Sequence, residues 1–119
     1  MTTTLGGNTA ISDSIGNIRS LPILAKTSGY TLIVSDIGKC ISITTGGITV
    51  PSAVFSAGDI ICVYNNSSSD QTITQGSGVT MRMVGTTFTG NRTLAQRGFC
   101  AIHCTTDPST FIIAGGGLT

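Results

Sequence analysis

From residue 30 to residue 119 the chain consists of short stretches rich in Val, Ile, Thr and aromatic residues, separated by turns rich in Gly, Asn and Ser. The first group of residues favours strands, and the second group breaks them. The turn signals recur roughly every 8 to 12 residues, which is typical of β-sandwiches and barrels. Because no helical pattern of about 10 to 15 residues lies between the strands, we do not expect a parallel sheet with crossover helices.

The composition also disfavours helices. Of the 119 residues only 9% are charged, there is no Glu, and the only lysines are Lys26 and Lys39. Glu and Lys are good helix formers, whereas the abundant Thr, Val and Ile favour strands. The length suits one domain with its own core. Since sparse charge weakens the repulsion between neighbouring surfaces, we expect an oligomer or a larger assembly.

Charge and hydropathy argue against two classes of partner. The net charge of +1 gives no reason to expect nucleic acid or an anionic membrane surface as a partner. The apolar runs are too short to span a bilayer, and residues 1–7 lack the basic and apolar regions of a signal peptide. We therefore expect a protein made and used in cytoplasm, with four reduced cysteines: Cys40, Cys62, Cys100 and Cys104.

The turn residues divide the chain into a polar N-terminal arm, residues 1–20, and one β-domain, residues 21–119. Pro22 lacks a ladder donor and so indicates an edge strand. Residues 51–57 are expected to form one helical turn under the sheet, and residues 65–70 a hairpin loop. No repeat of fixed period is visible. The predicted fold is all-β, an antiparallel β-sandwich or jelly-roll-like barrel, with strands at 21–25, 30–34, 39–44, 48–50, 59–64, 71–74, 79–84, 98–104 and 110–114.

The residue types that carry chemistry are few. On a strand Cys100 and Cys104 share a face with Ile102 between them, while His103 points the other way, so they do not form a metal site. His103, the only histidine, has no evident nucleophile or orienting carboxylate, and the alternative to a passive surface residue is an interface histidine. We predict no catalytic residue, no metal site and no cofactor.

The five Asp residues mostly stand at turns, where their side chains accept hydrogen bonds from nearby backbone donors. No opposed carboxylate pair or calcium loop stands out. The local cluster of like charges consists of Arg82, Arg92 and Arg97, with one nearby aromatic residue, Phe88. We interpret these arginines as inter-subunit residues that bind backbone carbonyls or Asp across a seam.

An ordered set of short motifs resembles a β-domain found in virion proteins of tailed bacteriophages. No single motif is specific or catalytic, and the resemblance rests on their order along most of the chain. The motifs are Tyr30-Thr31-Leu32, Asp36-x-Gly38-Lys39, Pro51 with Phe55-x-x-Gly58-Asp59, Tyr64-Asn65-Asn66-Ser67, Ile73-Thr74-Gln75-Gly76-x-Gly78-Val79-Thr80, Thr89-Gly90-Asn91-Arg92-Thr93-Leu94-Ala95-Gln96-Arg97-Gly98 and Gly115-x-Gly117-Leu118.

In that family the domain often closes a longer tail-fibre polypeptide, whereas here it follows only a short arm. The resemblance therefore implies a non-enzymatic capsid decoration (cement) protein, a homotrimer that binds the major capsid protein on the outer head surface. The alternative is a tail-fibre or receptor-binding tip that recognises a host-surface glycan or protein. On the first interpretation the arm contacts the capsid, and its expected contact residues are Thr2, Thr3, Thr4, Leu5 and Asn8.

Overall fold

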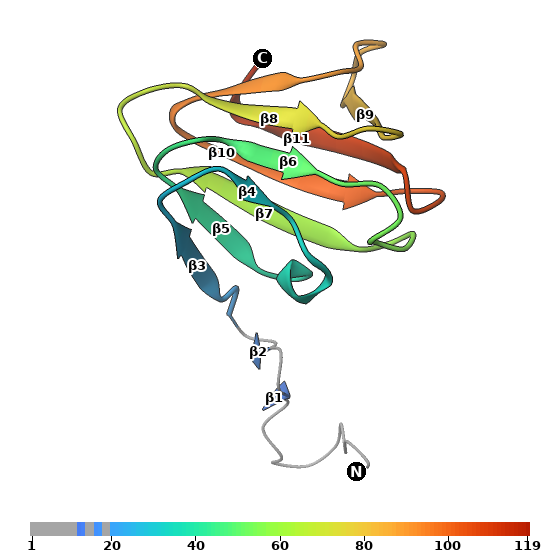
Figure 1. Cartoon of the computed structure of the whole chain (residues 1–119), viewed down its shortest axis with the longest axis horizontal. Coiled ribbons are helices and arrows are strands. Elements are labelled where there is room, and N and C mark those ends of the chain that lie inside the picture. The colour runs from blue at the N-terminus through green and yellow to red at the C-terminus, as the bar shows by residue number, and fades with distance from the viewer. Residues whose placement is uncertain (1–11, 14–15, 18–19) are drawn as a thin grey trace.

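The computed structural model describes residues 12–13, 16–17 and 20–119 of the chain. Its elements are almost all strands, which confirms the all-β prediction, and they form a sandwich with a nearly closed, barrel-like sheet (Figure 1). The elements are β1 (Ser12–Asp13), β2 (Gly16–Asn17), β3 (Ile23–Lys26), β4 (Tyr30–Thr31), the 3-10 turn η1 (Val34–Asp36), β5 (Cys40–Ile43), β6 (Ile48–Val50), β7 (Ile60–Asn65), β8 (Gln71–Gln75), β9 (Thr80–Met83), β10 (Arg92–Cys104) and β11 (Thr110–Leu118).

The chain winds alternately through two layers. Strands β3, β5 and β7 lie side by side in one layer, and β4, β6 and β8 lie side by side in the other (Figure 1). From β3 to β6, each strand is parallel to the strand two places later in the sequence, so β3 pairs with β5, β4 with β6, β5 with β7, and β6 with β8. This half of the molecule is built like three coils of a parallel β-helix.

The expected antiparallel pairing therefore holds only for part of the molecule. Parallel neighbours need a crossover connection of a dozen or more residues, which is usually a helix. Here the crossover between two parallel strands is itself a strand of the opposite layer. Antiparallel sandwiches and parallel coils both consist of short strands and polar turns. The sequence pattern therefore did not distinguish between these two arrangements.

The coils differ in length, which hides the repeat in the sequence. Along one layer the partners in register are Ile23, Cys40 and Cys62, separated by 17 and then 22 residues. Along the other layer Tyr30, Ile48 and Ile73 are separated by 18 and then 25 residues. The strands stay in register in both layers because the turns between them differ in length.

Strands β10 and β11 join the two layers. The first residues of β10 pair antiparallel with β8, and the residues from Phe99 onward pair antiparallel with β7. Between these parts the register with β11 shifts, and Arg97 has a left-handed backbone with φ 57°. Such a bulge bends a strand, which lets β10 pass from one layer to the other. Strand β9 extends the sheet by pairing in parallel with β11.

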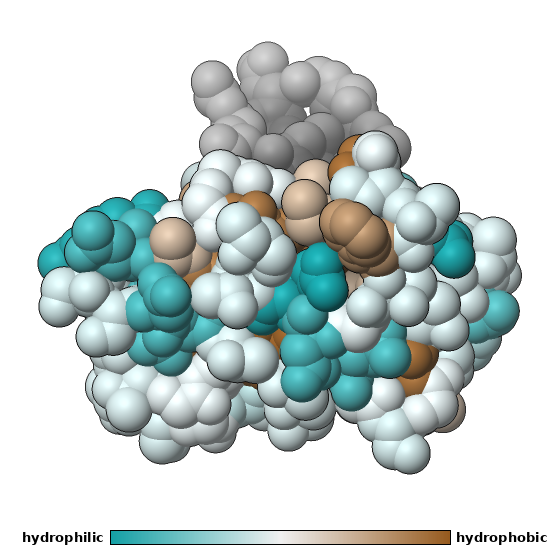
Figure 2. All heavy atoms as spheres, turned by 90° about the horizontal axis from the view of Figure 1, so that it is seen from above, coloured by the Kyte–Doolittle hydropathy of each residue, from teal (hydrophilic) through white to brown (hydrophobic). Residues whose placement is uncertain are grey.

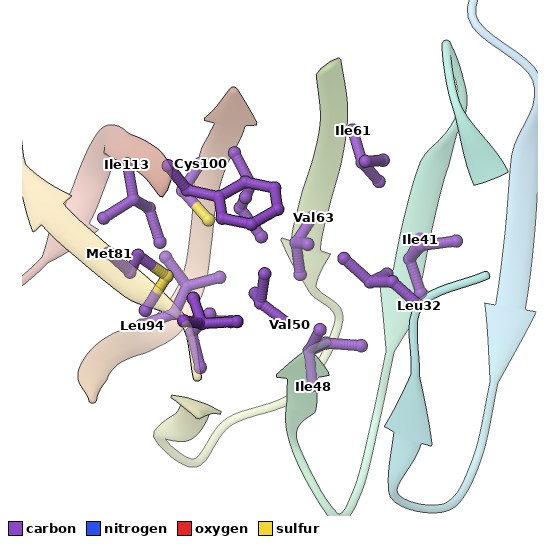
Figure 3. Close-up of a cluster of buried hydrophobic side chains, with 14 of the residues drawn as sticks. Leu32, Ile41, Ile48, Val50, Ile61, Val63, Met81, Leu94, Cys100 and Ile113 are labelled. Atoms are coloured by element: carbon purple, nitrogen blue, oxygen red, sulfur yellow. The ribbon is translucent and has the colours of Figure 1, made fainter. Parts of the chain in front are cut away.

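The core lies between the layers and is almost entirely aliphatic. Side chains from both layers point toward one another in Figure 3, for example Val63 of β7 and Val50 of β6. Phe55 and Phe111 meet edge to face, with ring centroids 6.0 Å apart. Burying one aliphatic side chain of this size contributes roughly 1.5 to 3 kcal/mol, so these residues hold the layers together. The largest fully buried side chains are Phe55, Phe111, Leu32, Ile41, Ile43, Ile48, Ile61, Ile73, Met81, Leu94, Ile102 and Ile113.

Several predicted elements need correction. Residues 51–57 contain no helical turn, and only Phe55 of that segment is fully buried, while Val54 is exposed. Residues 66–70 join β7 to β8 across the two layers and so do not form a hairpin. The predicted strand 30–34 stops at Thr31, and η1 follows it. Strands β10 and β11 are longer than expected. The edge position predicted from Pro22 is confirmed, because β3 ends the strand order.

The predicted N-terminal arm, residues 1–20, lies almost entirely outside the described residues. The structure describes only β1 and β2 there, which pair antiparallel as two residues each.

Candidate functional site

One outer side of the sandwich is apolar across five strands. In register across β3, β5, β7, β10 and β11, one row of outward-facing residues contains Ile23, Cys40, Cys62, Ala101 and Ala114. A second row contains Ala25, Ser42, Tyr64, Phe99 and Gly116, and a third contains Ile60, His103 and Ile112. We call these outward-facing residues the apolar face.

Several large side chains of the apolar face are open to solvent. The exposed fraction is 69% for Ile23, 45% for Phe99 and 41% for Ile60. Single exposed apolar residues are ordinary, but several on one sheet face are typical of an interaction surface. No charged residue stands in the three rows, and Arg82 of β9, which is in register with Ile112, lies at their border. The apolar face is thus the candidate functional surface.

The other outer side of the sandwich carries threonine in the corresponding positions. Thr31, Thr49 and Thr74 are in register across β4, β6 and β8, and Thr72 is opposite Thr93 of β10. We call these five residues the threonine face. Each threonine carries one hydroxyl and one methyl group, so the face is uncharged but readily hydrated. Seen from above, much of the surface has the pale colour of near-neutral hydropathy, broken by small hydrophilic and hydrophobic areas (Figure 2).

The four cysteines divide between the core and the apolar face. Cys100 and Cys104 are buried in the core with Ile102 between them, as the alternation predicted. Cys40 and Cys62 are register partners on the opposite side of the sheet. Burial is the main cause that raises the pKa of all four thiols, that of Cys100 to about 12, and so weakens them as nucleophiles.

His103 lies on the apolar face, on the opposite side of β10 from Cys104, as predicted. Its register partners are Ile60 and Ile112, so its strand neighbours offer neither a nucleophile nor a carboxylate. Across residues 20–119 the side chains form no group of three or more His, Cys, Asp or Glu residues placed to hold a metal ion. In the same part of the chain no helix is long and apolar enough to cross a membrane.

The three arginines do not converge on one site. Arg82 faces outward on β9 at the border of the apolar face. Arg92 donates from Nε to the carbonyl of Asn91, 2.7 Å away, and from Nη1 to the sulfur of Met83. Arg97 donates from Nη1 to Oδ1 of Asn66 at 2.7 Å. Two of the three guanidinium groups therefore already bind groups within their own chain, and an inter-subunit role of these arginines stays a prediction.

Buried amides hold the turn after β7. Asn65 donates from Nδ2 to the carbonyls of Leu94 and Ala95, both 3.0 Å away, and so ties the turn to the bend of β10. Gln71 accepts a hydrogen bond from the backbone of Gly47 and donates to the carbonyl of Thr44. Because these polar groups are buried and paired, their role is to fix the connection between layers.

A second polar cluster lies on the first coil, and the sequence analysis missed it. Asp36 is 1% exposed, and its Oδ2 accepts hydrogen bonds from the Tyr30 hydroxyl and the Ile33 amide, both at 2.8 Å. Burial, together with the hydrogen bond and charge of Asp36, raises the pKa of Tyr30 to about 12. The Nζ atom of Lys26 lies 4.3 Å from the centroid of the Tyr30 ring. The spacing of six residues between Tyr and Asp carries no recognised signal.

Two other Asp residues serve turns, as predicted. Asp59 accepts a hydrogen bond from the backbone of Ser56, and Asp107 accepts one from the backbone of Ser109. Asp36 also accepts from the backbone of its own turn, but it differs from them by being buried. The residues predicted to contact a capsid, which are Thr2, Thr3, Thr4, Leu5 and Asn8, lie outside the described residues.

Comparison with known proteins gives no family assignment. No protein-family model matches the chain, and no curated protein matches it. The functional argument therefore rests on the chain's own surfaces and on the motif resemblance.

Proposed function

We propose that this chain is a non-enzymatic structural protein of a tailed-bacteriophage particle. In this proposal it is a decoration protein, made in the host cytoplasm, that binds the major capsid protein on the outer head surface as a homotrimer. The motif order from Tyr30 to Leu118 supports the phage origin. The observation that carries the structural role is the apolar face, an uncharged sheet surface with the large side chains of Ile23, Ile60 and Phe99 exposed. Such a surface suits contact with other protein subunits.

A decoration protein works by mass action. A protein that binds the assembled shell but not its dissociated subunits stabilises the shell, in proportion to the logarithm of its free concentration over its dissociation constant. This role needs a rigid domain and surfaces that fit other subunits. The fully buried aliphatic core and the paired buried amides Asn65 and Gln71 supply the rigidity. The N-terminal arm, residues 1–20, is proposed to extend the contact with the head lattice.

The test is to add the purified protein to whole phage particles, with heads and tail fibres, that lack it and to locate it by electron microscopy. Density over the head surface, together with heads that withstand higher temperature, is the expected result. Density at a fibre end would support the alternative, a receptor-binding tip. Binding to neither structure would contradict both roles.

A truncation tests the arm. Deleting residues 2–15 leaves β3 to β11 intact, and so the domain is expected to fold and oligomerise but no longer to coat heads. Undiminished coating by the truncated protein would remove the arm from the proposal without touching the role of the domain.

A further inference from the structure

We propose that the apolar face is a self-association surface, which copies of this chain bury against one another. The inference deepens the proposed function and rests on its homotrimer, because it names the surface through which copies associate, in solution as well as on a capsid. It also places the seam between subunits on the sheet face instead of on Arg92 and Arg97, whose guanidinium groups bind within their own chain.

The pattern of exposure is the first reason. Phe99 and Tyr64 are register partners on the apolar face, Ile23 is exposed in the next row, and Ile60 is exposed in the row beyond that one. These large side chains are spread over the face, and between them Cys40 and Ser42 are only 6% and 9% exposed. Several exposed large apolar side chains on one sheet face are typical of a surface covered by protein. The large side chains stand beside small ones such as Ala101 and Gly116, so the face has both projections and hollows.

Charge decides the kind of occupant. The rows of the apolar face contain no Asp, Glu, Lys or Arg from β3 to β11. A nucleic acid or a charged peptide finds no complementary group there. Two copies of an uncharged face, in contrast, meet without like-charge repulsion. A second copy is therefore the occupant that the chemistry of this face suits.

The dimensions of the apolar face suit a protein partner of similar size. Strands spaced about 4.8 Å apart, with residues rising about 3.3 Å each, cover about 330 Å² in projection when β7, β10 and β11 contribute five residues each and β3 and β5 three each. The projecting side chains raise the accessible area above that value. Stable interfaces bury about 800 Å² of accessible surface on each partner, so the face supplies one part of such an interface and the strand edge beside it must supply more.

The open edge of β3 extends the same surface. The carbonyls of Pro22 and Lys26 accept hydrogen bonds from Cys40 and Thr44, so the alternate residues Ile23 and Ala25 turn their backbone groups away from β5. Within the described residues no strand pairs with that edge of β3. Unpaired backbone groups beside an exposed apolar side chain add a second means of attachment for a neighbouring copy.

The experiment compares the mass in solution of the full chain and three variants, by light scattering or sedimentation. Phe99→Asp and Ile60→Asp place a carboxylate on the apolar face at solvent-exposed positions, so the charge is hydrated in the monomer but not in the seam. Thr72→Asp is the matched control on the threonine face. Circular dichroism and thermal unfolding verify that each variant is folded.

We expect the wild type and Thr72→Asp to have at least twice the 12.1 kDa mass of one chain, and the two face variants to approach that single-chain mass. Folded face variants that keep the wild-type mass would overturn the inference, as would a monomeric wild type at micromolar concentration. Head binding is scored separately. A protein that coats heads but associates through another surface contradicts the inference and leaves the proposed function intact.

Discussion

The two outer sides of the sandwich differ in chemistry although the chain winds through both in the same way. On the apolar face the outward positions hold residues such as Ile23, Ile60 and Phe99, and on the threonine face they hold Thr49 and Thr74. Ile and Thr are both β-branched, so both suit a strand. Strand formation does not require the difference, and we infer that it reflects what each side meets outside the molecule.

The inner sides of the same strands sharpen this comparison, and they give the largest expected effect. Ile61 lies under the apolar face and Ile73 under the threonine face, and their exposed fractions are 1% and 0%. Truncation to Ala removes buried methyl groups and leaves a cavity, so each variant should lose about 2 to 5 kcal/mol of unfolding free energy. Denaturant unfolding measures both. A large loss at only one position would mean that the layers differ inside as well.

Two adjacent glycines of β11 separate the inner side from the apolar face. A Cβ on Gly115 would meet the carbonyl oxygen of Phe99 and the Cα of Cys100, whereas a Cβ on Gly116 meets open space. Gly115→Ala should therefore lower the free energy of unfolding by about 1 to 3 kcal/mol, as overpacking of a core does. Gly116→Ala should be neutral or should stabilise by up to about 1 kcal/mol. Thermal unfolding of the pair distinguishes them, and equal losses would contradict the assigned orientations.

A substitution in the first coil, where β3 and β4 form the ends of the two layers, should have a smaller effect on stability, and this effect should depend on pH. Tyr30→Phe removes one of the two hydrogen bonds to the buried Asp36 carboxylate and should cost about 1 to 2 kcal/mol at neutral pH. The pKa of Tyr30 is raised to about 12 in the folded protein, against about 10 when unfolded.

The sign of this pH dependence follows from proton binding. Between pH 10 and 12 the unfolded tyrosine loses its proton while the folded one keeps it, so wild-type stability falls as the pH rises through this range. Tyr30→Phe should lose stability less steeply from pH 10 to 12. Denaturant midpoints at four or five pH values measure the two slopes, and parallel slopes would exclude Tyr30 as a contributor.

The smallest expected change in stability comes from making the threonine face resemble the apolar one. Thr72→Val combined with Thr74→Val keeps β-branching at exposed and half-buried positions, so each change should alter the unfolding free energy by no more than about 0.5 kcal/mol. The mass in solution should nevertheless rise, since two hydroxyls of this second face are then replaced by methyl groups. Thr45→Val, at an exposed turn position, is the control. An unchanged mass would show that apolar side chains alone do not cause association.

Alternation along single strands was predictable from the sequence, whereas the choice of strand partners was not. The inward positions of Ile41, Ile43, Cys100 and Cys104 and the outward position of His103 follow from a period of two. Which strands lie side by side depends on contacts far apart in the chain. No local signal shows that Asn65 binds carbonyls 29 and 30 residues away.

The apolar face was missed for the same reason. Its rows collect two or three outward residues from each of five strands, and none of those strands is conspicuous alone. Once the register is known, Ile60, His103 and Ile112 become neighbours. The arginines stood out because they are close in the sequence. In the structure, however, Arg97 donates a hydrogen bond to Asn66 in the turn after β7, and Arg92 donates one to the sulfur of Met83 in β9.

The unequal coils have a practical consequence for engineering. The turns absorb spacings of 17 and 22 residues in one layer and of 18 and 25 in the other without loss of register. Lengthening a flexible loop costs little, about 0.6 kcal/mol for each doubling. A foreign peptide grafted into a connection between coils should therefore be carried at the rim of the sandwich, and a particle coated with this protein would present many copies of that peptide.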